Sequence, residues 1–127
     1  MSPKNILWVE DDQDSIDIVV PLLQREGWHV STASSAAEGK AKAGSAKPDC
    51  IIMDIIMEGE HGFSAIEDLK SDPALVSIPV IIFSSVTHRW SKTTATRRDG
   101  LTTEADDFID KAAGPEALIA SLRRYLK

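Results

Sequence analysis

The sequence predicts an α/β fold, with five parallel strands in one sheet and helices on both of its faces. First, short apolar runs alternate along the chain with segments whose apolar residues have helical spacing. Second, several of these runs are continuously hydrophobic, as strands buried on both faces are. Third, the connections are short and contain no repeat or low-complexity linker, which favours right-handed crossovers in a doubly wound (βα)5 sheet.

The first part of the chain is expected to contain two strand–helix units. Residues 6–9 predict the first strand, and residues 28–32 predict a weaker second strand. The segment between them has apolar side chains at helical spacing and ends near Gly27. Ser35 and Glu38 are spaced as in a capping box, which predicts the start of an alanine-rich helix.

The rest of the chain continues the alternation. Apolar runs at residues 50–56, 80–83 and 108–109 predict the third, fourth and fifth strands. Pro115 suits the first turn of a final amphipathic helix. The threonine-rich stretch 88–103 has little apolar periodicity, so we expect the fourth helix to be short or displaced.

Composition limits the function classes. A chain of 127 residues fits a single domain with one core, and 43% hydrophobic with 27% charged residues is typical of a soluble globule. The net charge of −6 argues against binding to nucleic acid or to an anionic membrane surface. Apolar runs are too short for a signal peptide or a membrane span, and Cys50 is the only cysteine. We therefore expect a cytoplasmic protein.

Polar side chains follow the apolar runs at the points where the predicted strands end. Glu10 and Asp11 follow the first strand, and Asp54 interrupts the third. Ser84 ends the fourth strand and Lys111 follows the fifth. Parallel strands place their carboxyl ends at one edge of the sheet, where ligands of such folds bind. These side chains are therefore expected to converge there.

The chemistry of this set points to phosphoryl transfer assisted by a metal. Three carboxylates in a partly dehydrated crevice repel one another, and a hard divalent cation such as Mg²⁺ or Mn²⁺ removes the conflict. Asp54 is then a candidate carboxylate nucleophile towards a phosphoryl donor. The Lys111 ammonium and the Ser84 hydroxyl are candidates to bind the phosphoryl oxygens.

Purely structural interpretations stay open for single residues. Asp12 is equally consistent with capping the first helix. Alone, Ser84 would be a turn residue and Lys111 a solvated lysine at the start of a helix. Asp54 has few structural roles, because a charge inside an apolar run must be paired. The convergence of the set is what favours a functional site.

Segments in a fixed order carry a family resemblance. They are ILWVEDD at 6–12, PDCIIMD at 48–54, Gly62, IPVIIFS at 78–84 and ADDFIDK at 105–111. Each is weak alone, but together they resemble the receiver domains of two-component response regulators over nearly the whole chain. The resemblance implies a flavodoxin-like receiver fold, with residues 1–127 as a single receiver domain and no output domain.

The resemblance also implies roles for the acidic residues. Asp54 matches the phosphoacceptor of the family. Asp11 matches the direct Mg²⁺ ligand, and Glu10 matches the second acid, which acts through water. Ile56 occupies the position whose backbone carbonyl binds the metal.

Two further roles follow from the same resemblance. Ser84 and Lys111 match the hydroxyl and the lysine that bind the phosphoryl group. Phe108 matches the aromatic switch position, which rotates inward as Ser84 reorients towards the phosphoryl group. This movement would change the surface around the last strand and helix.

The chain also departs from the family pattern. Ala112 stands where proline commonly follows the lysine, often after a cis bond, so the loop at Lys111 is expected to take another path. The segment before the fifth strand is longer than usual. Ile56 and Val86 occupy positions that tune dephosphorylation, and both are too apolar to position a water, which predicts slow self-dephosphorylation.

These features predict a phosphoryl-accepting response regulator in a two-component phosphorelay. The expected partners are a histidine kinase or histidine phosphotransfer protein and a downstream protein target, and the chain is expected to be a monomer or weak dimer. It should catalyse only its own phosphotransfer and dephosphorylation. A degenerate receiver that binds partners without phosphorylation is the main alternative. A phosphatase that works through an aspartyl intermediate is disfavoured because the position two residues after Asp54, where such enzymes carry a second acid, is Ile56. A flavin site is disfavoured because the three acids after the first strand would repel phosphate.

Overall fold

The computed structural model describes residues 3–55, 62–85 and 105–126. In these residues a five-stranded sheet has the order β2-β1-β3-β4-β5, and every neighbouring pair is parallel. The elements are β1 (Asn5–Val9), α1 (Gln13–Arg25), β2 (His29–Ala33), α2 (Ala36–Ala46), β3 (Cys50–Met53), α3 (Gly62–Ser71), β4 (Val80–Ser84), β5 (Asp107–Asp110), the 3₁₀ turn η3 (Lys111–Ala113) and α5 (Pro115–Tyr125). The predicted doubly wound α/β fold is confirmed.

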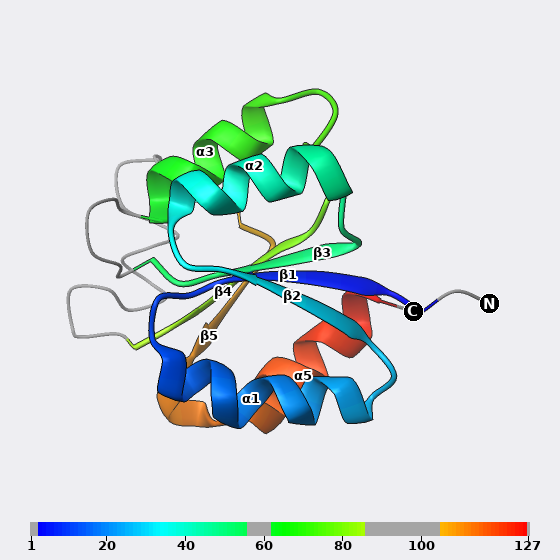
Figure 1. Cartoon of the computed structure of the whole chain (residues 1–127), viewed down its shortest axis with the longest axis vertical. Coiled ribbons are helices and arrows are strands. Elements are labelled where there is room, and N and C mark those ends of the chain that lie inside the picture. The colour runs from blue at the N-terminus through cyan, green and yellow to red at the C-terminus, as the bar shows by residue number, and fades with distance from the viewer. Residues whose placement is uncertain (1–2, 56–61, 86–104, 127) are drawn as a thin grey trace.

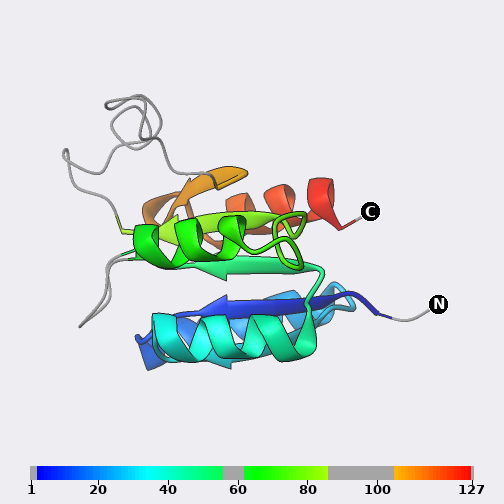
Figure 2. The same ribbon diagram turned by 90° about the horizontal axis from the view of Figure 1, so that it is seen from above.

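The molecule has three layers, with the sheet in the middle. Helices α2 and α3 cover one face, and α1 and α5 cover the other (Figure 1). The view from above shows the strands running in the same direction, with their carboxyl ends opposite the N-terminus (Figure 2). In the described part of the chain, no helix is long and apolar enough to cross a membrane.

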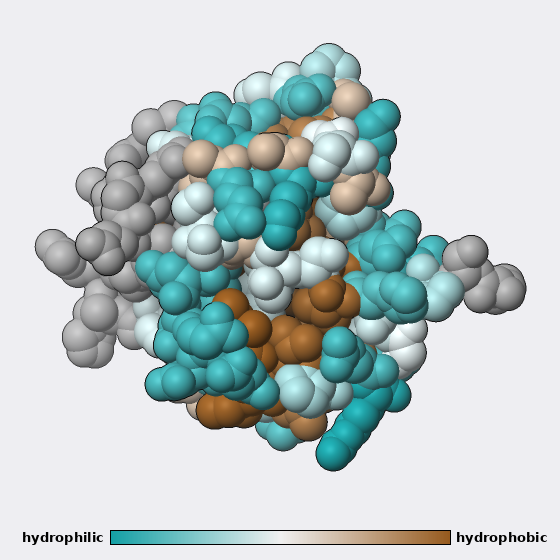
Figure 3. Space-filling model, in the orientation of Figure 1, coloured by the Kyte–Doolittle hydropathy of each residue, from teal (hydrophilic) through white to brown (hydrophobic). Residues whose placement is uncertain are grey.

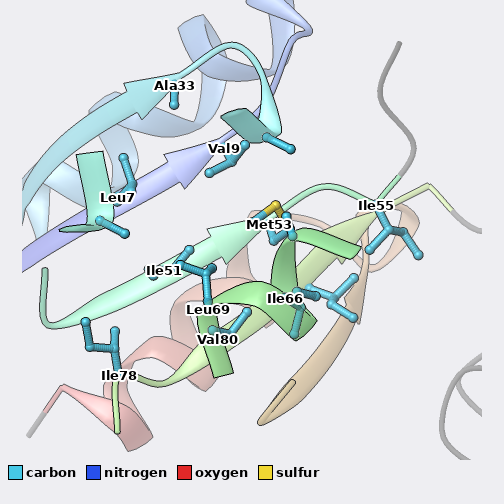
Figure 4. Packing of buried hydrophobic residues seen from close by; sticks show 14 of the residues in the cluster. Leu7, Val9, Ala33, Ile51, Met53, Ile55, Ile66, Leu69, Ile78 and Val80 are labelled. Carbon is cyan, nitrogen blue, oxygen red and sulfur yellow. The ribbon is translucent and has the colours of Figure 1, made fainter. Parts of the chain in front are cut away.

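Two apolar clusters hold the layers together. On one face, Leu7, Ile51 and Val80 of the strands pack with Ile66 and Leu69 of α3 (Figure 4). On the other face, strand side chains that include Trp8, Ile52 and Ile81 pack with Leu23 of α1 and Leu122 of α5. Strands with core on both faces explain the continuous apolar runs in the sequence.

Local signals begin the helices at the expected places. Asp12 caps α1: its carboxylate accepts hydrogen bonds from Asp14 N at 3.2 Å and from Ser15 Oγ at 2.7 Å. Ser35 caps α2 by accepting from Glu38 N at 3.1 Å. The structural interpretation of Asp12 is thus confirmed. Of the predicted capping box, the bond to Ser35 is present, but the Glu38 carboxylate accepts from the N–H of Ser34 at 2.7 Å.

The third strand is shorter than its apolar run predicts. The run continues to Ile56, but β3 is Cys50–Met53 and the chain bends at Ile55. Ile55 is nevertheless 1% exposed, so the apolar pattern reflects burial beyond the end of the strand. Ile56 and the stretch 88–103 lie outside the described residues.

Candidate functional site

The sheet order brings the polar residues at the strand ends together. β1 and β3 are neighbours in a register that pairs Val9 with Met53, so Glu10 and Asp54 follow directly on adjacent strands. The Asp54 N–H donates to the Val9 carbonyl at 3.0 Å, which holds the backbone of Asp54 against the end of β1. Next to β3, β4 ends at Ser84.

Three acidic side chains form a cluster at this edge. Oxygens of Glu10, Asp11 and Asp54 all lie within 4.8 Å of one another. Glu10 is fully buried, Asp54 is 4% exposed, and Asp11 is exposed to solvent. The cluster therefore has two carboxylates inside the fold and one at its mouth.

Ser84 connects β4 to this cluster. Its hydroxyl donates a hydrogen bond of 2.5 Å to Oδ1 of Asp54, and the side chain is fully buried. A short bond from a hydroxyl to a carboxylate is a charge-assisted interaction. It directs one oxygen of Asp54 towards Ser84.

Lys111 contacts both buried carboxylates. Its Nζ lies 2.7 Å from Oε1 of Glu10 and 3.4 Å from Oδ2 of Asp54. The lysine begins η3, which Asp110 caps by accepting from Ala112 N at 2.9 Å. No cis peptide occurs in the described residues, so the chain reaches this position with Ala112 after a trans bond.

The environment shifts the proton affinity of these groups. Burial, followed by the hydrogen bond with Asp54, raises the pKa of Glu10 to about 7 although Lys111 opposes the shift. Burial tends to lower the pKa of Lys111, but the hydrogen bond with Glu10 and the charge of Asp54 outweigh it and raise that pKa. Lys111 is therefore a cation held between two acids.

The donor set fits a hard divalent cation. Carboxylate oxygens are the ligands that Mg²⁺ and Mn²⁺ take in proteins, and an exposed acid beside two buried acids leaves access from solvent. Burial and the neighbouring Asp54 both disfavour the charged form of Glu10. A bound divalent cation would offset this repulsion between the carboxylates. The backbone carbonyl predicted for Ile56 lies outside the described residues.

The predicted site residues within the described part of the chain thus divide into two groups. Glu10, Asp11, Asp54, Ser84 and Lys111 form one constellation. Phe108 is not part of it: its side chain is 8% exposed and packs in the core cluster beside α2 and α3. The contact between Lys111 and Glu10 is one that the sequence reasoning missed, although their opposite charges at converging strand ends were a usable signal.

A doubly wound parallel sheet with acids, a hydroxyl and an ammonium at the carboxyl ends of its strands defines a class of proteins that bind ligands at that edge. The sequence model of the response regulator receiver domain family matches residues 6–123. The chain therefore belongs to this family.

Individual relatives agree with this assignment. Protein PilH of Pseudomonas aeruginosa is 31% identical over 121 residues, which cover 95% of this chain and 96% of PilH. Response regulator PleD of Caulobacter vibrioides is 32% identical over 93% of this chain, which spans 25% of PleD. The crystal structure of the Vibrio cholerae chemotaxis protein CheY4 superimposes with a TM-score of 0.83 at 27% identity and covers 97% of this chain and 98% of CheY4.

Proposed function

We propose that this chain is a phosphoryl-accepting response regulator in which Asp54 receives the phosphoryl group. One observation carries the proposal: Asp54 is a nearly buried carboxylate that contacts the Ser84 hydroxyl and the Lys111 ammonium and lies beside Glu10 and Asp11. A buried carboxylate with this set of neighbours suits a nucleophile better than a structural ion pair.

The chain's own residues suggest how the transfer proceeds. An oxygen of Asp54 attacks the phosphorus of the donor, and a new O–P bond forms as the bond to the donor's nitrogen or oxygen breaks. The leaving group keeps the electron pair of the broken bond. Lys111 and Ser84, already in contact with Asp54, would then bind oxygens of the transferred group.

The acidic cluster would hold Mg²⁺ or Mn²⁺. Asp11 and Asp54 are proposed as direct ligands, Glu10 as a ligand through water and Ile56 as a carbonyl ligand. When bound, the ion supplies positive charge that lets a phosphate dianion approach the carboxylates and that stabilises its developing charge. The chain's own contribution is to hold the acids close together before the ion arrives.

The signal is proposed to leave the site through Ser84 and Phe108. Phosphorylation would draw Ser84 from Asp54 towards the new group, and the packing of Phe108 would change in response. The proposed donors are a histidine kinase or a histidine phosphotransfer protein in the cytoplasm. The proposed recipient is a downstream protein rather than nucleic acid or membrane, and the chain would act as a monomer or weak dimer.

The test is phosphorylation by a small donor. The wild type and Asp54→Ala are incubated with Mg²⁺ and acetyl phosphate, and the intact mass of each is recorded. Asp68→Ala, which removes an exposed acid of α3, serves as the matched control. We expect one phosphoryl group on the wild type and on Asp68→Ala, and none on Asp54→Ala.

Two outcomes of this experiment would contradict the proposal. If the wild type gains no phosphoryl group and also fails to bind beryllofluoride, the proposal is wrong and the chain is a degenerate receiver. If Asp54→Ala is phosphorylated as fast as the wild type, another residue is the acceptor.

A further inference from the structure

The outer edge of β2 is an open strand edge. β2 is the first strand of the sheet and pairs only with β1 among the described residues. The His29 N–H donates to Lys4 O, and the Ala33 carbonyl accepts from Glu10 N, so these two residues face β1. Since neighbouring residues of a strand point their backbone groups to opposite sides, the N–H and C=O groups of Val30 and Thr32 face outward.

The strand itself contains none of the usual protection against edge-to-edge pairing. The sequence His29–Ala33 is HVSTA, with no proline, lysine or acid. Natural proteins commonly block such edges with charged side chains, above all lysine, or with proline or bulges. For β2 that protection has to come from another element.

Lys42 of α2 supplies it. Its Nζ donates a hydrogen bond of 2.5 Å to the backbone carbonyl of Thr32, on the outward side of the strand. Glu38, one turn earlier in α2, lies 3.2 Å from the same Nζ and orients it. A charged ammonium therefore occupies an acceptor that an added strand would need.

We propose that the open edge of β2 is a pairing surface for a second copy of this chain, and that Lys42 keeps the chain monomeric by occupying the Thr32 carbonyl. An antiparallel pair of β2 strands about a twofold axis at Ser31 sets Val30 opposite Thr32 of the partner subunit. That pairing requires the carbonyl that Lys42 occupies. It also brings the two Lys42 ammonium groups near each other, which disfavours the dimer further.

A second copy suits this edge because it would bring the same apolar surface to both sides of the new strand pair (Figure 3). Apolar side chains gather on the surface over α1 and alongside β2 (Figure 3). The half-buried apolar side chains on this face of the sheet include Ile16 and Val20 of α1 and Val30 of β2. A twofold axis perpendicular to the sheet puts both α1 helices on the same face of a continuous sheet, so these apolar surfaces would flank the new strand pair.

The test compares the oligomeric state of matched variants by sedimentation velocity over a range of concentrations. Lys42→Met keeps the length and helix propensity of the side chain but removes its charge and its donor. Lys40→Met removes an equal charge from the same helix, where Lys40 pairs at 2.9 Å with Asp68 of α3 instead of with β2. We expect a dimer dissociation constant for Lys42→Met at least about tenfold below that of the wild type, and no change for Lys40→Met.

A second pair of measurements locates the interface. Thr32→Pro removes an outward N–H that β1 does not use, so Lys42→Met/Thr32→Pro should return to the monomer. Amide exchange of Val30 and Thr32 in Lys42→Met should slow as protein concentration rises, whereas the wild type should exchange at a constant rate. The proposal is overturned if Lys42→Met self-associates no more than the wild type. It is also overturned if the proline variant still dimerises, or if these two amides gain no protection.

Discussion

At the scale of single residues, Glu10 is a carboxyl group that the fold buries although burial disfavours its charged form. Its carboxyl is fully buried at the end of β1, next to Asp54 and Lys111. Burial and the neighbouring carboxylate raise the pKa of Glu10 to about 7, from the 4.5 of an ordinary glutamate. Between these two pH values the folded chain holds a proton that the unfolded chain has lost.

Stability without metal should therefore depend on pH through Glu10. Because the folded state binds more protons between pH 4.5 and about 7, the free energy of unfolding should fall as pH rises through this window. Between pH 4.5 and about 7 we expect the free energy of unfolding of the wild type to fall by about 1 to 3 kcal/mol more than that of Glu10→Gln. Urea titrations of both proteins at each pH measure this difference. Equal pH slopes for the two proteins would contradict the prediction.

Ser84 is the second residue whose environment predicts a measurable effect. Ser84→Ala removes the hydroxyl that donates to Asp54 and that is proposed to bind the phosphoryl group. We expect phosphorylation by acetyl phosphate to slow by roughly ten- to hundredfold, because one donor to the developing charge is lost. Ser121→Ala is the matched control, since Ser121 is an equally buried serine that donates to Asp107 instead. Equal losses in both variants would indicate a general effect on folding.

At the scale of elements, the packing of α2 against β1 depends on a glycine. A Cβ built on Gly39 would lie 2.6 Å from Cγ2 of Val9, closer than carbon atoms pack. Val9 is fully buried and its branched side chain has few rotamers, so it has little room to move. Gly44, in the same helix, would place its Cβ in open space.

This contrast predicts opposite effects of the same substitution. Gly39→Ala should lower the free energy of unfolding by about 1 to 3 kcal/mol, because overpacking outweighs the better helix propensity of alanine. Gly44→Ala should raise it by up to about 1 kcal/mol, because only the propensity changes. Denaturant titrations of both variants test this, and stabilisation by Gly39→Ala would show that α2 can move away from β1.

At the scale of the whole molecule, the proposed metal site joins residues that are far apart in the sequence. Its described acids follow β1 and β3 and come together only when these strands pair, so an ion held there would bind the folded chain and not the unfolded one. A ligand with this preference stabilises the fold by mass action.

Mg²⁺ should therefore stabilise the chain against unfolding. At a free concentration ten times the dissociation constant, the expected gain is about 1.4 kcal/mol, measured by urea titration at constant ionic strength. Asp11→Asn should lose this gain, whereas Asp14→Asn, at an exposed acid in the first turn of α1, should keep it. Retention of the full gain by Asp11→Asn would exclude Asp11 as a ligand.

Much of the fold and site could be predicted because their signals are local. The apolar run around Ile52 indicates a buried strand wherever that strand lies, and Ser35 with Glu38 marks a helix start by its spacing alone. The end of β3 could not be predicted in this way, because Ile55 is as buried as the strand that precedes it. An apolar pattern records burial and does not record where pairing with a neighbouring strand stops.

By itself, the sequence determined that strands and helices alternate, that the sheet is parallel, and that acids, a hydroxyl and a lysine stand at the strand ends. Only the tertiary structure decided that Lys111 contacts Glu10 more closely than Asp54 and that Lys42 reaches the Thr32 carbonyl. The physical reason is that periodicity and capping act within a few residues. Side-chain contacts between elements depend instead on the register and packing of the complete sheet.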